Sequence, residues 1–204
     1  YSQGNEDTGK DETLVNRNVI AVAALGSGGK FSGYSNYGSN VFVTAPSNHL
    51  SEPYGFGITT TDRTGADLGY NRYSNDKNKD GDQNDSFPDY NYASMFGGTS
   101  SSAPLVSGII ALGKEANSAL DVRMAKHVLA RTSTKVDAGD TSSTGGWLKN
   151  SAGYWFNPNY GFGNINAGAF VEKVLNVGYV TEQTSVTKSA AVAAAIPDND
   201  PAGV

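Results

Sequence analysis

The strongest constraint on the fold is a short and almost continuous apolar run, NVIAVAAL, at residues 18–25. A short run that contains β-branched residues and is bounded by Gly is typical of a strand buried on both faces of a parallel sheet. Such a strand needs neighbours, and the sequence offers two more candidates, at residues 41–45, which Pro46 ends, and at residues 57–61. We therefore expect an α/β fold whose central parallel sheet has too few strands in this chain to be complete.

The second half of the chain has the periodicity of helices. Residues 121–133 and 166–175 each predict a helix, and residues 147–162 predict an aromatic hairpin between them. Residues 101–117 predict a further helix, buried on most faces, because apolar and small side chains recur at helical spacing: Val106, Ile109, Ile110 and Gly113. By contrast, residues 62–97 show no convincing periodicity, and a long segment of that kind is usually functional or ordered by a metal.

The composition excludes several classes of protein. The chain has 204 residues and no Cys, which rules out disulfides, thiol catalysis and Cys-ligated zinc. Its net charge is −5 and its Lys and Arg residues form no blocks, so nucleic acid is not an expected partner. No apolar run approaches the ~18 residues that a membrane span needs, so we expect no membrane association. The length suits one domain, or one domain and a tail.

A Gly-rich turn leads into the first predicted helix through the sequence GGTSSSAP at residues 97–104. A Ser at such a junction is suited to act as a nucleophile. The Gly residues let a substrate approach the backbone, and the helix dipole favours negative charge that develops there. The same residues taken alone are also typical of an ordinary Ser or Thr cap at a helix N-terminus.

The order of the surrounding segments matches one family. GTSSSAPLVSG resembles the nucleophile motif of subtilisin-like serine proteases, and VIAVAALGSGGKFSGYSNYGSNVFVTAPS resembles the strand, Ser-rich turn, strand and Ala-Pro of that family. Three further segments resemble its kexin/furin-like branch: ITTTD, DVRMAKHVLARTS and YGFGNINAGAFVEKV. The resemblance implies a subtilisin-like three-layer α/β sandwich with a central parallel sheet, of which this chain holds the C-terminal portion.

The last residues, IPDNDPAGV, resemble the opening of the β-rich P domain that follows the catalytic domain in the kexin/furin-like branch. We therefore expect residues 1–177 to be the C-terminal portion of a peptidase domain, and residues 178–204 to be a linker and the first residues of a P domain. The chain begins at Tyr1 without an initiator Met or a signal peptide, so we expect it to be processed or to be a piece of a longer protein.

The resemblance implies roles for five residues. Ser100 corresponds to the nucleophile, and the side chain of Asn5, in SQGNE, corresponds to the amide that donates a hydrogen bond to the oxyanion. Gly98 and Thr99 would lie against the substrate. Asp11 stands where the branch has an Asp that selects Arg or Lys in its specificity pocket. Taken alone, Asn5 also fits a Gly-Asn turn and Asp11 a surface acid, so both alternatives stay open.

The chain offers no evident base for a Ser nucleophile, which needs a His and an orienting carboxylate. Of its two His residues, His127 lies inside a predicted helix and His49 in a surface-loop composition, so we interpret both as structural. Residues 7–9, Asp-Thr-Gly, match the pattern around the family's catalytic Asp but follow no apolar strand, which makes the match a coincidence. We expect the triad His and Asp to lie upstream of Tyr1, in the N-terminal part of the same catalytic domain, and this chain alone to be inactive.

An oxygen-rich cluster inside the aperiodic segment predicts a Ca²⁺ site. Gly81 permits the sharp turn of an EF-hand-like loop, although Phe87 stands at the twelfth position in place of Glu, and Asp89 could complete the shell. A solvated acidic loop is the alternative. Asn36 lacks the charge that the branch has at this turn, which puts a second calcium site in doubt. The predicted ligands are Asp76, Asn78, Asp80, Asp82, Asn84 and Asp85.

These patterns together predict a secreted or periplasmic serine endopeptidase that hydrolyses peptide or protein substrates by acyl transfer to Ser100. Its partners would be the N-terminal part of the catalytic domain and a downstream P domain. Two alternatives stay open. One is a non-catalytic calcium-binding or scaffold fragment of a subtilase fold. The other is a two-chain protease in which a nicked N-terminal fragment stays bound.

Overall fold

The computed structural model describes residues 16–49, 57–71, 89–178, 180–181 and 184–189. Its central element is a parallel pair of strands, β1 (Ala21–Leu25) and β2 (Val41–Pro46). All five residues of β1 are buried, as a doubly covered strand requires. A parallel bridge between Thr44 and Asn164 adds a further piece of backbone beside β2. The prediction of a buried parallel strand at the start of the chain is confirmed.

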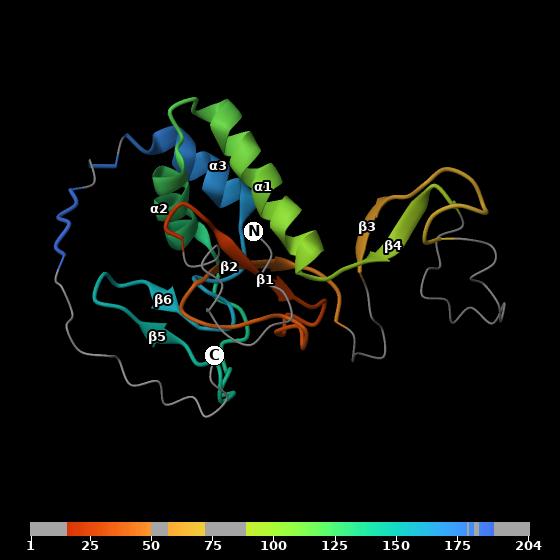
Figure 1. Ribbon diagram of the computed structural model, residues 1–204, viewed down its shortest axis with the longest axis horizontal. Coiled ribbons are helices and arrows are strands. Elements are labelled where there is room, and N and C mark those ends of the chain that lie inside the picture. Colours follow the sequence, from red (N-terminus) through yellow and green to blue (C-terminus); the bar gives the residue numbers. More distant parts are fainter. Residues whose placement is uncertain (1–15, 50–56, 72–88, 179, 182–183, 190–204) are drawn as a thin grey trace.

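Three helices lie along one side of this sheet: α1 (Thr99–Ala116), α2 (Val122–Thr132) and α3 (Ala167–Asn176) (Figure 1). Two of them begin with side-chain caps, since Asp121 accepts a hydrogen bond from the Met124 N–H and Asn166 accepts one from the Ala169 N–H. The core between the helices and the sheet is aliphatic, apart from one Phe. Its members include Val22, Val43, Ala45, Val106, Val128, Leu129, Phe170 and Val174.

The first helix departs from its prediction in two ways. It begins at Thr99, two residues earlier than expected, and it is buried along one side only. Leu112 is 53 % exposed and Leu105 is 36 % exposed. The helical spacing of apolar residues predicts burial on most faces, but the described residues pack against one side. That side includes Gly113, where an added Cβ would lie 2.6 Å from the Phe170 ring, so Gly lets α1 and α3 approach closely.

A β-hairpin precedes α1, and the sequence patterns predict only the first of its two strands. Strand β3 (Ile58–Thr61) was expected, whereas β4 (Tyr92–Phe96) falls in the segment without periodicity. The two strands pair antiparallel and extend away from the central sheet (Figure 1). In β4 only Ala93 is buried, so the strand has no alternating pattern of large apolar residues, and its pairing with β3 overrides the weak local preference. The hairpin matters because only two residues separate the end of β4 from the helix that carries the Ser motif.

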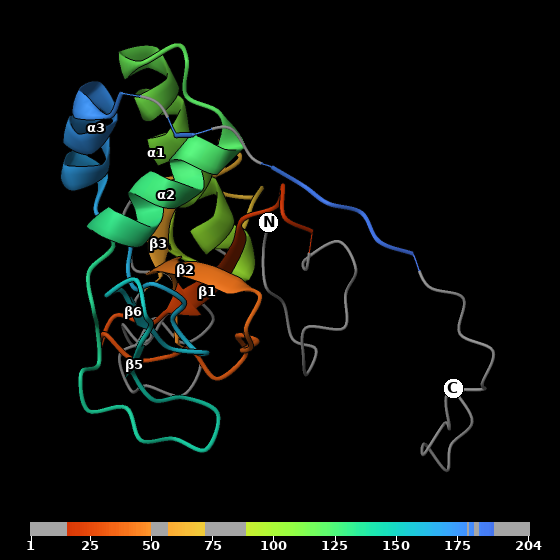
Figure 2. The same cartoon turned by 90° about the vertical axis from the view of Figure 1, so that its left-hand side faces the viewer.

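The predicted aromatic hairpin is present as β5 (Leu148–Lys149) and β6 (Trp155–Phe156), on the side of the sheet opposite the helices (Figure 2). Tyr160 anchors it, with its ring stacked on Trp147 at a centroid distance of 6.0 Å. The buried Tyr160 hydroxyl accepts the Phe31 N–H at 2.8 Å and donates to Asp137 at 3.1 Å. Burial raises the pKa of Tyr160, so the phenol stays protonated and able to donate.

The carboxylate of Asp140 is hydrogen-bonded to residues on both sides of this hairpin in the sequence. Burial alone would raise the pKa of Asp140, but hydrogen bonds from Asn157, Ser142 and Asn159 outweigh that effect and lower the pKa to about 2. A lowered pKa means that the contribution of Asp140 to stability is present above its ordinary pKa and is lost only as the pH falls through about 2. The hydrogen bonds of the ionised Asp140 carboxylate therefore persist at neutral and mildly acidic pH.

Candidate active site

The three consecutive serines at residues 100–102 differ in their burial and in their hydrogen bonds. Ser101 and Ser102 are 2 % and 0 % exposed, and their hydroxyls bond inside the protein. The Ser102 Oγ donates to the Ala45 carbonyl at 3.0 Å, and the Ser101 Oγ lies 2.9 Å from the Gly98 carbonyl. The Ser102 contact joins the start of α1 to the end of β2, and the Ser101 contact lies within the turn itself. Ser100 is exposed, and within the described part of the chain its Oγ makes no hydrogen bond.

Ser100 occupies the first turn of an 18-residue helix. The helix is not capped by a Ser or Thr side chain: its N-cap is Gly98, with φ 77° and ψ 169°, a conformation that favours Gly. The Ser100 N–H has no hydrogen-bond acceptor among the described residues, and no acidic side chain lies in the first turn. A free N–H beside an exposed hydroxyl at a helix N-terminus can stabilise an anion that forms on an attached acyl group.

The turn before Ser100 is held on both sides. The Gly98 carbonyl accepts from the Ser47 Oγ at 2.8 Å and from the Ser101 N–H at 3.0 Å. The Gly98 N–H donates to the side chains of Asn48 and Tyr34. Thr99 is 5 % exposed, so the residue just before the exposed Ser100 is itself buried. The roles of Gly98 and Thr99 in binding the substrate stay predictions.

The sequence model of the Subtilase family matches residues 1–163 of this chain. The chain belongs to the subtilase family. The Aeromonas extracellular serine protease of Aeromonas sobria is 37 % identical over 190 residues, which are 84 % of this chain and 30 % of that protein. A calcium-dependent protease of Trichormus variabilis is 36 % identical over 174 residues, covering 84 % of this chain and 23 % of the relative.

Solved structures agree with the subtilase fold. The crystal structure of the Aeromonas sobria serine protease in complex with the chaperone ORF2 matches with a TM-score of 0.67 and 34 % identity. The match covers 80 % of this subtilase chain and 30 % of the solved chain. The chain thus spans less than a third of the length of these relatives. The predicted α/β fold is confirmed, and the family assignment at the level of subtilisin-like serine proteases is confirmed with it.

Within the described residues of this subtilase, no hydrogen bond joins Ser100 to either His. His127 is exposed on α2, and His49 is half-buried, with its Cβ 2.8 Å from the place that a Cβ on Gly26 would take. The interpretation of both His residues as structural stays a prediction. Among the side chains that the structure places, no group of three or more His, Cys, Asp or Glu residues gathers in a way that could hold a metal.

Several predicted positions of the subtilase lie outside the described residues. They are Asn5, Asp11, the Asp-Thr-Gly triplet at residues 7–9, the start of the P domain, and the predicted calcium ligands Asp76, Asn78, Asp80, Asp82, Asn84 and Asp85. Asn36, which lacks the charge that the kexin/furin-like branch has at this turn, is 6 % exposed. None of the helices that the structure describes is long and apolar enough to cross a membrane.

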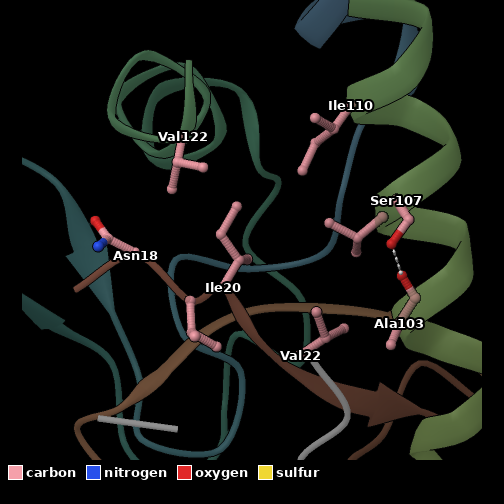
Figure 3. A pocket seen from close by; sticks show the side chains of 9 residues that line it. Asn18, Ile20, Val22, Ala103, Ser107, Ile110 and Val122 are labelled. Carbon is pink, nitrogen blue, oxygen red and sulfur yellow. Dashed lines mark hydrogen bonds between the residues drawn. The ribbon is translucent and has the colours of Figure 1, made fainter. Parts of the chain in front are cut away.

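The subtilase chain also has an apolar groove between α1 and the residues that lead into β1 (Figure 3). Its volume is about 290 Å³. Ile20, Val22, Ile110 and Val122 point into it from three elements, and Ser107 lies at its edge with its Oγ hydrogen-bonded to the Ala103 carbonyl. In the described part of the chain, β1 pairs with β2 and with no second strand. The groove is therefore open beside a sheet edge.

Proposed function

We propose that this chain carries the nucleophile half of a serine endopeptidase active site. The Ser100 Oγ attacks the carbonyl carbon of the scissile peptide bond. The amine is then expelled, and water hydrolyses the Ser100 ester to release the acid. The observation that carries this proposal is the contrast within the Ser triplet: only Ser100 is exposed, and it stands beside its own free N–H at a helix N-terminus.

The oxyanion of the tetrahedral intermediate would be held by two neutral donors, the Ser100 N–H and the side-chain amide of Asn5. Such donors act strongly because they are oriented before the charge develops. The backbone at Gly98 and Thr99 would lie against the substrate. This arrangement needs no charged group in the first turn of α1, and an acidic side chain there would oppose it.

The base and its orienting carboxylate would come from the N-terminal part of the same catalytic domain. Two observations support this division. No His of the described residues bonds to Ser100, and among those residues β1 pairs with β2 as its one neighbouring strand, beside an apolar groove that borders α1. A further strand beside β1 would extend the parallel sheet and cover the half-buried Ile20. The relatives are more than three times as long as the matched region, so they have chain enough to supply it.

We expect residues 1–204 alone to show no peptidase turnover and no labelling by a fluorophosphonate, while the full-length protein that carries this chain is labelled at Ser100. The physical reason is that a Ser hydroxyl without a base is a weak nucleophile. Mass spectrometry of the labelled peptide, run on both proteins side by side, measures this. Labelling of the short chain would overturn the division of the site. A full-length protein that is not labelled would favour the non-catalytic scaffold.

Finer assignments follow from the sequence patterns. We propose that the protease belongs to the kexin/furin-like branch and that Asp11 selects a basic residue in its specificity pocket. Residues 1–177 would end the peptidase domain, and residues 178–204 would be a linker and the start of a P domain. Secretion is supported by the extracellular protease of Aeromonas sobria. A two-chain form, with a nicked N-terminal fragment bound, would use the same groove.

We propose a Ca²⁺ site in the acidic loop between β3 and β4. Oxygen donors at alternate positions suit a hard cation, and four closely spaced Asp residues repel one another without one. The antiparallel pairing of β3 with β4 holds the two ends of this segment together, which favours a closed loop. The proposed ligands are Asp76, Asn78, Asp80, Asp82, Asn84 and Asp85, and the calcium-dependent protease of Trichormus variabilis supports the choice of ion.

Calcium titration followed by calorimetry should detect binding to the full-length protein that weakens at least about tenfold in Asp80→Ala, because one of the central carboxylates is lost. Asp67→Ala is the matched control, since Asp67 is an exposed acid in the same connection but outside the cluster. Equal affinity in Asp80→Ala and Asp67→Ala would contradict the proposed ligand set.

A further inference from the structure

The turn that presents Ser100 depends on two side chains that the sequence patterns did not single out. The N–H of Gly98 donates to the Asn48 Oδ1 at 3.1 Å and to the Tyr34 hydroxyl at 3.2 Å. Asn48 follows β2, and Tyr34 lies in the Ser-rich connection between β1 and β2. Residues far apart in the sequence therefore meet at one N–H, two residues before Ser100.

These two acceptors hold each other in place. The Tyr34 hydroxyl lies 2.7 Å from the Asn48 Oδ1 and 2.6 Å from the Asn48 carbonyl. The same carbonyl accepts from the buried Ser32 Oγ at 2.8 Å. The Tyr34 hydroxyl is also 2.7 Å from the Ser47 Oγ, which donates to the Gly98 carbonyl. The network therefore forms hydrogen bonds with both the N–H and the carbonyl of Gly98.

The Asn48 side chain also lies directly against the turn. A Cβ added to Gly97 would stand 2.0 Å from the Asn48 Cγ, so Gly97 leaves the space that this amide fills. Two adjacent Gly residues have a backbone that can adopt many conformations, and Gly98 has a positive φ of 77°. Without outside contacts, the peptide that joins Gly97 and Gly98 could rotate, and the start of α1 would move with it.

We propose that Tyr34 and Asn48 are positioning residues for the nucleophile. By accepting the Gly98 N–H, they hold the Gly97–Gly98 peptide in the one orientation that aligns the Ser100 Oγ and N–H with a bound carbonyl. They touch neither substrate nor reacting atoms, and they act through the backbone. A misplacement of about 1 Å at a reacting atom can cost about a hundredfold in rate, so a modest loosening of this turn would be measurable. The inference rests on the function proposed above.

The test uses the full-length protein with Tyr34→Phe, which removes only the hydroxyl, and Asn48→Leu, which keeps the size but removes the acceptor. Each preparation is titrated with a fluorophosphonate to count active sites, and the acylation rate constant per active site is then measured with an ester substrate. We expect each variant to lose about tenfold or more in acylation rate, with KM changed less than about threefold. Asn48→Asp, which retains an acceptor oxygen, should recover most of the rate.

Tyr160→Phe is the matched control. Tyr160 is also a Tyr whose hydroxyl accepts a backbone N–H, from Phe31 at 2.8 Å, but it lies beside the β5–β6 hairpin. It should lower the thermal midpoint without changing the acylation rate per active site. Unchanged acylation in both Tyr34→Phe and Asn48→Leu would overturn the positioning role, even if their thermal midpoints fall. A wild-type protein that is not labelled at Ser100 would overturn the proposed function itself, and the positioning role with it.

Discussion

Replacing Ser100 with Ala in the full-length protein is expected to reduce kcat for peptide hydrolysis by a factor on the order of 10⁶, the loss measured for the equivalent change in subtilisin, which is itself a subtilase. The reason is chemical. Acyl transfer needs a nucleophilic oxygen, and no neighbouring hydroxyl can replace this one, because those of Ser101 and Ser102 are buried and bonded to carbonyls. Steady-state hydrolysis of a peptide substrate at saturating concentration measures the effect.

Ser118→Ala provides a matched control for this experiment. Ser118 is an exposed Ser just after the end of α1, and it does not line the apolar groove. We expect its removal to leave kcat within about twofold, since surface substitutions of this kind rarely change stability by more than about 0.5 kcal/mol. If Ser100→Ala kept the activity of Ser118→Ala, the nucleophile would have been assigned to the wrong residue.

The largest loss of stability is expected for Gly161→Ala. Gly161 has φ +60°, and an added Cβ would lie 2.3 Å from the Phe42 carbonyl oxygen and 2.8 Å from the Val43 nitrogen. Both contacts are to the backbone of β2, which cannot move aside as a flexible side chain could. A left-handed conformation alone costs Ala roughly 1–2 kcal/mol, and the displacement of a central strand adds to it. We expect a total of about 3 kcal/mol or more.

The measurement is the thermal midpoint of the full-length protein in a Ser100→Ala background, where autolysis does not intervene. A loss of about 3 kcal/mol corresponds to a fall of roughly 6–12 °C for a domain of roughly 150–250 residues, and to a smaller fall for a larger catalytic domain. Gly168→Ala is the control: it lies in α3, and the nearest atom to its added Cβ is 3.8 Å away. Because Ala favours a helix over Gly by roughly 0.5–1 kcal/mol, the control should stay level or rise. Equal midpoints for the two variants would contradict the close approach of Gly161 to β2.

Local patterns predicted those elements whose residues pack in the way their spacing suggests. Residues 18–25 contain a strand buried along its whole length, and the two capped helices begin beside the Asp and Asn that precede them. The prediction was wrong about the burial of α1, because periodicity reports which side chains share a face and not how many faces are covered. It also missed β4, since pairing with a distant strand, and not its own pattern, makes that segment extended.

The Ser motif shows a property that local sequence patterns do not predict, namely which of three adjacent hydroxyls is exposed. Ser100, Ser101 and Ser102 are chemically identical in the sequence, and only the resemblance to a family pointed to the first of them. In the structure, α1 turns each successive residue by about 100°, so two of the three face the end of β2 and one faces outward. Tyr34 and Asn48 carried no signal at all, because their partner, the Gly98 N–H, is 64 and 50 residues away in the chain.

The sequence by itself therefore determined the class of fold, because buried strands and helix caps depend on residues that are neighbours in the chain, and its resemblance to a family determined the candidate nucleophile. Only the tertiary structure decided which hydroxyl is exposed, which N–H stays free and which side chains hold the turn. Those properties come from β2, the connection before it and α1 meeting in space. Contacts over 50 residues or more depend on packing, which no local pattern records.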